Sequence, residues 1–162
     1  MSYIDSTLMS GERVVARARL HWITYVSALI FFLVSLLLFL AAVTVQPRQS
    51  VAALTVAGLL TFTTASAAGL RALIAAKTSE FAVTNKRVLI KLGFIRRTSV
   101  EVLLSKVEAI KVEQSIAGRI LDFGSIVITG TGGSRDPYHR IAAPLEFRRA
   151  VQEQVAAVQE AR

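Results

Sequence analysis

The stretch FAVTNKRVLIKLG, residues 81–93, decides the fold of the C-terminal half of the chain. Two apolar runs meet at Asn85-Lys86, a pair of residues that favours a tight turn. In the second run side chains alternate across a strand, so Val88, Ile90 and Leu92 share one face. The opposite face carries Arg87, Leu89 and Lys91. The stretch therefore predicts a β-hairpin of the kind found in water-soluble domains.

The period of two continues downstream of this hairpin. We expect strands at about 80–83, 87–92, 97–104, 107–113, 125–129 and 138–141. In the fourth of these, Ile110 and Val112 face inward while Lys111 and Glu113 face outward. A helical turn is predicted within SIAGRILDFG, with Gly124 as its C-cap.

A final helix is predicted over 144–160, since Pro144 is tolerated in a first helical turn. Its apolar residues repeat at intervals of four, four and three, which gives one apolar stripe. They are Phe147, Val151, Val155 and Val158. Strands followed by one amphipathic helix predict that residues 77–162 form a mainly-β barrel or sandwich capped by a C-terminal α-helix.

Upstream of this domain, residues 23–76 are predicted to form a transmembrane hairpin of two helices. The first span, 23–45, has no charge and contains 15 Val, Ile, Leu or Phe among its 23 residues. That length crosses a hydrocarbon core of about 30 Å. The second span, 51–70, is less apolar, and small residues such as Ala65 and Gly69 suit it to pack on the first. A buried helix of a soluble protein is the alternative for this second segment.

Charge predicts the orientation of the hairpin. The connection at 46–50 carries one Arg, whereas basic residues concentrate before the first span and after the second. By the positive-inside rule both termini are cytoplasmic, in a multi-pass protein of the inner membrane. The residues expected to anchor the helix ends at the membrane interface are Arg19, His21, Trp22, Tyr25 and Arg71.

The N-terminal segment, residues 1–22, contains a further strand pattern. Residues 12–20, ERVVARARL, alternate so that Glu12 and Val14 face one side while Arg13 and Arg17 face the other. We expect this strand to pair with the barrel, which makes the membrane hairpin an insertion between it and the remaining strands. The alternative is an amphipathic segment that lies on the lipid surface.

Several short motifs resemble those of the bacterial pleckstrin-homology-like (PH-like) membrane proteins. Upstream they are GER at 11–13 and HW at 21–22; downstream they are VTNKR at 83–87, LSKV at 104–107, VEQS at 112–115, GR at 118–119 and FGS at 123–125. The resemblance covers residues 11–149. It implies seven strands in two bent sheets, closed at one end by a C-terminal helix. It implies no function, although eukaryotic PH domains often bind phosphoinositide headgroups or protein ligands.

The basic residues of the early loops are the predicted site for a lipid or a partner protein. In a PH-like fold these loops form an open, positive end, and each Lys or Arg near an anionic surface contributes about 1 kcal/mol. The candidates are Lys86, Arg87, Lys91, Arg96 and Arg97. A solvated rim without a ligand is the alternative.

Composition argues against several functions. The chain contains no Cys, and its two His, His21 and His139, lack metal-ligand spacing. GTGG at 130–133 lacks the Lys and helix start of a phosphate-binding loop. The formal net charge is +8 without a nucleic-acid motif, so anionic lipid is the expected electrostatic partner. We expect no metal, cofactor, nucleic acid or small-molecule substrate. We expect the Ser and Thr of the second span to hydrogen bond to their own backbone or across the helix pair rather than to line a transport path.

Together these features predict a non-enzymatic scaffold at the cytoplasmic face of the inner membrane. It docks a membrane-protein partner or assembles as a homo-oligomer. The alternative is a module that senses anionic lipid headgroups through its basic loops. The two differ in their response to salt, which screens headgroup binding more strongly than a packed interface.

Overall fold

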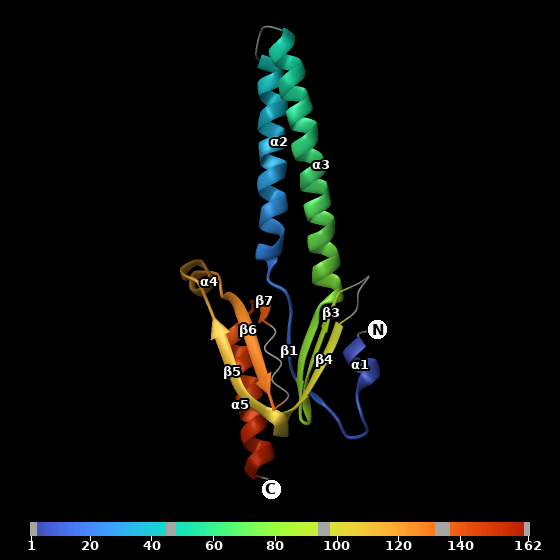
Figure 1. Cartoon of the computed structure of the whole chain (residues 1–162), viewed down its shortest axis with the longest axis vertical. Helices are drawn as coiled ribbons and strands as arrows, with labels where there is room; N and C mark the ends of the chain where they lie inside the picture. Colours follow the sequence, from blue (N-terminus) through green and yellow to red (C-terminus); the bar gives the residue numbers. More distant parts are fainter. Residues whose placement is uncertain (1–2, 45–47, 94–97, 132–136, 161–162) are drawn as a thin grey trace. The chain divides into compact units, whose positions relative to one another are not determined.

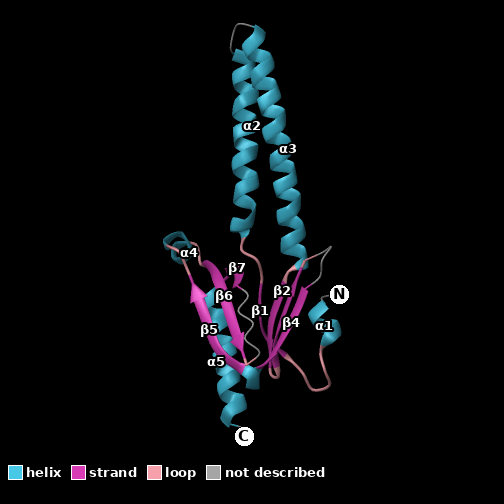
Figure 2. Ribbon diagram, in the orientation of Figure 1, coloured by secondary structure: helices cyan, strands magenta, loops and turns pink. Residues whose placement is uncertain are grey.

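The computed structural model describes residues 3–44, 48–93, 98–131 and 137–160. It divides into two compact units, which we call the helical unit, Trp22–Ile74, and the β unit, Met1–His21 with Ala75–Arg162 (Figure 1). The β unit is thus built from chain on both sides of the helical unit. Figure 2 shows that strands are confined to the β unit, within the described residues.

The helical unit begins with a short 3₁₀ turn, η1 (Trp22–Tyr25), which leads into α2 (Val26–Thr44). The second helix, α3 (Arg48–Thr78), continues beyond the predicted span, and its last turn belongs to the β unit. Both helices are long and apolar enough to cross a membrane. In the most apolar 18-residue stretch of each helix, only 6% and 11% of the residues are buried, respectively. Low burial distinguishes them from the core helices of a soluble protein.

Small residues bring α2 and α3 into contact. Buried Ser35 donates its hydroxyl proton to the carbonyl oxygen of Gly58 at 2.9 Å. A Cβ added at Gly58 would lie 3.2 Å from the ring of Phe39, and one at Gly69 would lie 3.7 Å from Ala28. These contacts agree with the packing role predicted for the small residues of the second span.

The hydroxyls of α3 bond to the backbone of their own helix, as predicted. Thr55, for example, donates to the carbonyl oxygen of Val51 at 2.8 Å, and Ser66 donates to that of Phe62 at 2.9 Å. The same local pattern holds for Thr61, Thr63 and Thr64. Polar side chains are therefore satisfied without a partner outside the helix.

Seven strands in the described residues form two antiparallel sheets. The first has the order β1-β2-β3-β4 and contains β1 (Val14–Ala18), β2 (Glu80–Thr84), β3 (Arg87–Leu92) and β4 (Thr98–Leu103). The second contains β5 (Val107–Glu113), β6 (Phe123–Gly130) and β7 (Pro137–Ala142). The turn between β2 and β3 falls at Asn85-Lys86, and the two sheets agree with the architecture that the PH-like resemblance implies.

β1 lies within the predicted strand 12–20 and borders both sheets. It pairs antiparallel with β2, with Ala18 opposite Phe81. Beyond β1 the chain turns to β7, where the Ala142 N–H donates to the Arg19 carbonyl oxygen at 3.0 Å. A bridge between Leu20 and Ile141 follows. The segment before the helical unit therefore joins the two sheets along one side.

Two short helices connect strands of the β unit, and one long helix follows the last strand. η2 (Leu104–Lys106) joins the sheets, α4 (Ile116–Ile120) lies between β5 and β6, and α5 (Pro144–Glu160) follows β7. The C-cap predicted at Gly124 is wrong, because α4 ends earlier and Asp122 takes the left-handed conformation, with φ 55°. Gly124 instead lies in β6, where a Cβ would come 2.7 Å from the Glu113 carbonyl oxygen.

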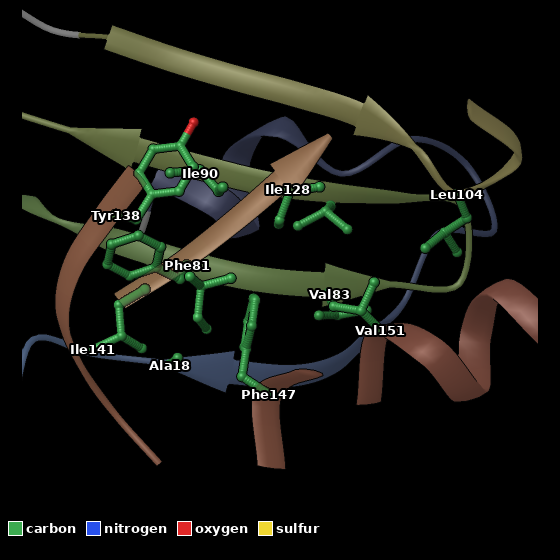
Figure 3. Packing of buried hydrophobic residues seen from close by; sticks show 12 residues of the cluster. Ala18, Phe81, Val83, Ile90, Leu104, Ile128, Tyr138, Ile141, Phe147 and Val151 are labelled. Carbon is green, nitrogen blue, oxygen red and sulfur yellow. The ribbon is translucent and has the colours of Figure 1, made fainter. Parts of the chain in front are cut away.

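The core lies between the two sheets and α5 (Figure 3). Phe81 and Tyr138 meet edge to face, with ring centroids 6.0 Å apart. Phe147 and Val151 of α5 are buried in this cluster, and Val155 and Val158 pack against it. The predicted apolar stripe of the C-terminal helix is thus the face that closes the β unit.

A smaller apolar cluster lies on the outer face of the first sheet. The N-terminal helix α1 (Tyr3–Thr7) places Ile4 against Ala82 and Leu89, and all three are buried. Sequence alternation predicted that Leu89 faces away from the main core, and α1 covers the face to which it points.

Candidate functional site

The predicted basic set is not gathered at one end of the β unit. Lys86 lies in the β2–β3 turn, whereas Lys91 lies near the far end of β3, about 17 Å away at 3.4 Å per residue. Lys91 is half-buried and its ammonium lies 4.0 Å from a Glu80 carboxylate oxygen. Arg96 and Arg97 fall outside the described residues.

Arg87 is not a surface residue, which corrects its selection as a binding candidate. It is only 4% exposed, and its guanidinium is occupied by protein acceptors. Nε and Nη2 donate to the two carboxylate oxygens of Glu12 at 2.9 Å each. Nη1 donates to Glu101 at 2.5 Å, and Nη2 also donates to the Thr7 carbonyl oxygen at 2.8 Å. A guanidinium held in this way serves the fold.

Glu12 is the buried counterpart of Arg87, and we call the two with Glu101 the ion-pair cluster. Besides Arg87, the carboxylate of Glu12 accepts from the Met9 N–H at 2.8 Å and from the Thr84 hydroxyl at 2.7 Å. Burial would raise the pKa of Glu12, but these hydrogen bonds, that from Arg87 foremost, outweigh it and hold the pKa at about 2. The hydrogen bond to Glu12 raises the pKa of Arg87 in turn.

Hydrogen bonds beside this cluster join two motifs that are far apart in sequence, GER at 11–13 and VTNKR at 83–87. The Asn85 side chain accepts from the Arg13 N–H at 2.9 Å and donates to the Gly11 carbonyl oxygen at 3.2 Å. Lys86 Nζ donates to the Ser10 carbonyl oxygen at 3.0 Å. The motifs that carry the family resemblance therefore hold the N-terminal segment onto the β2–β3 hairpin.

A second group of cations surrounds a pocket of about 290 Å³, which we call the basic pocket. Its walls come from α1, β1, the last turn of α3 and the start of β2. The lining residues are Ile4, Arg17, Arg19, Ala76, Lys77, Ser79, Glu80 and Phe81. Three cations and one carboxylate give the pocket a net positive charge.

The charged side chains of the basic pocket differ in whether they already have a partner within the protein. Arg17 pairs with Asp5, and both are exposed. Glu80 accepts from the Ile4 N–H at 3.2 Å. Among the described residues, no ion pair is formed by Arg19 or Lys77, and both are exposed. These two cations are available to an anionic ligand, and a phosphate group suits them because each offers several donors.

Sequence reasoning missed the basic pocket, although a signal for it was present. Arg17 and Arg19 lie two apart in a predicted strand, so they share a face. Lys77 lies 58 residues further on, and only the pairing of β1 with β2 brings it to them. Arg19 was predicted as a membrane anchor and is exposed at this pocket.

The other predicted anchors lie in different surroundings. His21 is only 8% exposed and its ring stacks on Phe123, with centroids 5.2 Å apart. Phe123 of the second sheet provides a packing partner for His21, so the His21 ring is covered by protein, unlike that of Trp22. Trp22 is 56% exposed, Tyr25 is half-buried and Arg71 is exposed on α3.

The two remaining polar motifs offer no catalytic arrangement in the described part of the chain. His139 lies on β7, exposed, with its Nδ1 2.8 Å from the Ser125 hydroxyl. No three His, Asp or Glu side chains among the described residues lie close enough to hold a metal ion. Much of GTGG falls outside those residues.

The fold and these sites define a small two-sheet domain closed by a helix, with charged and apolar surfaces that suit binding. A model of the bacterial PH domain family matches residues 14–156. Because the match covers most of the sequence, including β1 and the helical unit, the chain belongs to the bacterial PH domain family. Comparisons with curated proteins and with solved structures gave no match. A PH-like domain indicates an interaction module for protein or lipid.

Proposed function

We propose that this protein is a non-enzymatic, membrane-anchored interaction module. In this proposal α2 and α3 cross the inner membrane, and the β unit and both termini lie in the cytoplasm. The exposed apolar surface of the two helices supports the anchor. The basic residues that flank them, with Arg19 before Trp22 and Lys77 in the last turn of α3, support the orientation.

We further propose that the basic pocket binds the anionic headgroup of a lipid in the same membrane. The observation that carries this proposal is that Arg19 and Lys77, both exposed, line the same pocket. Each lies within three residues of the helical unit, so a headgroup would reach the pocket without leaving the bilayer surface. Each cation should contribute about 1 kcal/mol to binding of an anionic surface.

The test is native mass spectrometry of the full-length protein with phosphatidylglycerol or phosphatidylcholine added in detergent. The double variant Arg19→Gln/Lys77→Gln should retain roughly thirtyfold less phosphatidylglycerol, since two cations are lost. Its matched control is Lys86→Gln/Lys106→Gln, which removes two exposed cations at the other end of β3. Equal loss in both variants would contradict the basic pocket as the site.

A second candidate function is docking of a protein, and a separate groove favours it. β5 pairs only with β6 among the described strands, so it forms an edge of its sheet. Beside it lies a groove of about 270 Å³ between β5 and α5, lined in part by Ala109, Ile110 and Ala156. An edge strand next to a groove suits an added strand of a partner or of a second copy. A discrete homo-oligomer that Ala156→Glu dissociates would support this candidate.

A further inference from the structure

The helix α4 carries an apolar face that the β unit leaves uncovered. Ile116 is 81% exposed and Ile120 is 77% exposed, and residues four apart lie on the same side of a helix. Leu121, which follows them, is exposed as well. Single exposed apolar residues are ordinary, but two nearly bare isoleucines on one helical turn form a small apolar patch.

Local hydrogen bonds hold α4 in place. The Ser115 hydroxyl accepts from the Gly118 N–H at 3.1 Å and caps the helix. The Gln114 side chain donates to the carbonyl oxygens of Gly118 and Phe123, each at 3.2 Å. A Cβ at Gly118 would lie 2.5 Å from the Phe123 carbonyl oxygen, so only glycine allows this approach. The helix packs through its backbone side, which leaves the isoleucines pointing outward.

α4 lies at the end of the β unit where the chain leaves for the apolar helices. It projects beyond the ends of β5 and β6 (Figure 1). Phe123, three residues after Ile120, stacks on His21, the last residue of the β unit before the chain enters the helical unit. The Asp122 carbonyl oxygen also accepts from the Ala143 N–H at 3.0 Å, next to the residues that pair with Arg19. Trp22, where the helical unit begins, is the next residue along the chain.

We propose that α4 is a membrane-inserting wedge, in which Ile116, Ile120 and Leu121 enter the boundary between headgroups and acyl chains. This inference rests on the proposed membrane anchor. The bilayer is the expected occupant because the patch lies at the same end of the β unit as the entry to α2. Exposed Arg119, between the two isoleucines, suits the lipid phosphates at that depth. Insertion would restrict rotation of the β unit about its tether and hold the basic pocket at the headgroups.

The absence of Cys from the sequence allows the wedge to be tested with single labels on the full chain. Ile116→Cys and Ile120→Cys, each carrying an environment-sensitive fluorophore, are reconstituted in vesicles of phosphatidylcholine and phosphatidylglycerol with spin-labelled lipids. Ala157→Cys is the matched control, exposed on α5 and about 20 Å along that helix from Pro144 at 1.5 Å per residue. Leu37→Cys, on the exposed surface of α2, reports on the anchor itself.

The wedge predicts blue-shifted emission and severalfold quenching by shallow spin labels at positions 116 and 120, with neither effect at 157. Quenching at 37 by deep labels with none at 116 and 120 would overturn the wedge and leave the anchor standing. A blue shift at 116 and 120 without quenching would also overturn it, because a second copy would then cover the patch. Quenching at 116 and 120 but not at 37 would support the wedge and refute the anchor.

Discussion

Two groups of basic residues on the β unit have opposite properties, although both involve the N-terminal segment. In the ion-pair cluster, Arg87 is buried and four of its N–H contacts go to protein acceptors. In the basic pocket, Arg19 and Lys77 are exposed and form no ion pair among the described residues. Charge alone does not mark a binding site; the number of acceptors already engaged decides whether a cation can take a ligand.

This contrast predicts that Arg87→Ala has the largest effect on stability. The substitution leaves Glu12 buried without its partner, which costs about 3–5 kcal/mol in comparable pairs. Thermal unfolding of the full-length protein in detergent measures the loss. Arg17→Ala is the matched control, since the exposed pair with Asp5 should contribute less than about 1 kcal/mol. Equal melting temperatures for the two variants would remove the distinction between the groups.

The same cluster predicts a dependence of stability on pH. The pKa of Glu12 is about 2 in the folded protein, below its ordinary value, so the folded state binds fewer protons than the unfolded state. The resulting stabilisation, about 3 kcal/mol, is present above pH 4.5 and is lost as the pH falls toward 2. The difference in melting temperature between the wild type and Glu12→Gln should therefore shrink over that range. A constant difference would contradict the low pKa.

The basic pocket predicts the reverse pattern, with a change in binding and little change in stability. Lys77→Gln should alter the free energy of unfolding by no more than about 0.5 kcal/mol, as for most surface changes. Retention of phosphatidylglycerol should fall about fivefold, since one cation is lost. Wild-type retention should also weaken above physiological ionic strength. A large drop in melting temperature would place Lys77 with Arg87 as a structural cation.

The smallest effect is expected at Ser35, which extends the contrast to the helical unit. Its hydroxyl is buried and bonded to the Gly58 carbonyl oxygen, so Ser35→Ala removes one hydrogen bond between α2 and α3. Such bonds contribute about 0.6 kcal/mol on average in membrane helices. Ser27→Ala, at an exposed position of α2, is the control. Melting temperatures that do not differ would show that helix packing is independent of this bond.

Local patterns were sufficient to predict most of the fold. Alternation around Asn85-Lys86 located the hairpin, and the spacing of Phe147 and Val151 identified the buried face of α5. Alternation also predicted that Arg87 and Lys91 share a face, which is correct. It could not predict that the N-terminal segment covers the Arg87 end of that face, because this contact joins residues more than seventy positions apart.

For the described residues of the predicted basic set, the difference from the structure has the same reason. Lys86 and Lys91 are close in sequence, but an extended strand separates them, while Arg19 and Lys77 are distant in sequence and share a pocket. His21 looked interfacial beside Trp22, yet its surroundings are set by Phe123 of another sheet. Local sequence specifies which way a side chain points, and long-range pairing specifies what it meets.

The position of β1 has a consequence for how the protein is made. β1 is synthesised before the helical unit, but its partner β2 is synthesised after it, with Ala18 opposite Phe81. In the proposed topology, the first sheet therefore cannot assemble until both helices have left the ribosome and the chain has returned to the side of the membrane on which β1 lies. A chain whose helices insert incorrectly leaves β1 with an open edge and Glu12 without Arg87. We expect such a chain to be a ready substrate for proteases, which would make the fold of the β unit a checkpoint on the insertion of these helices.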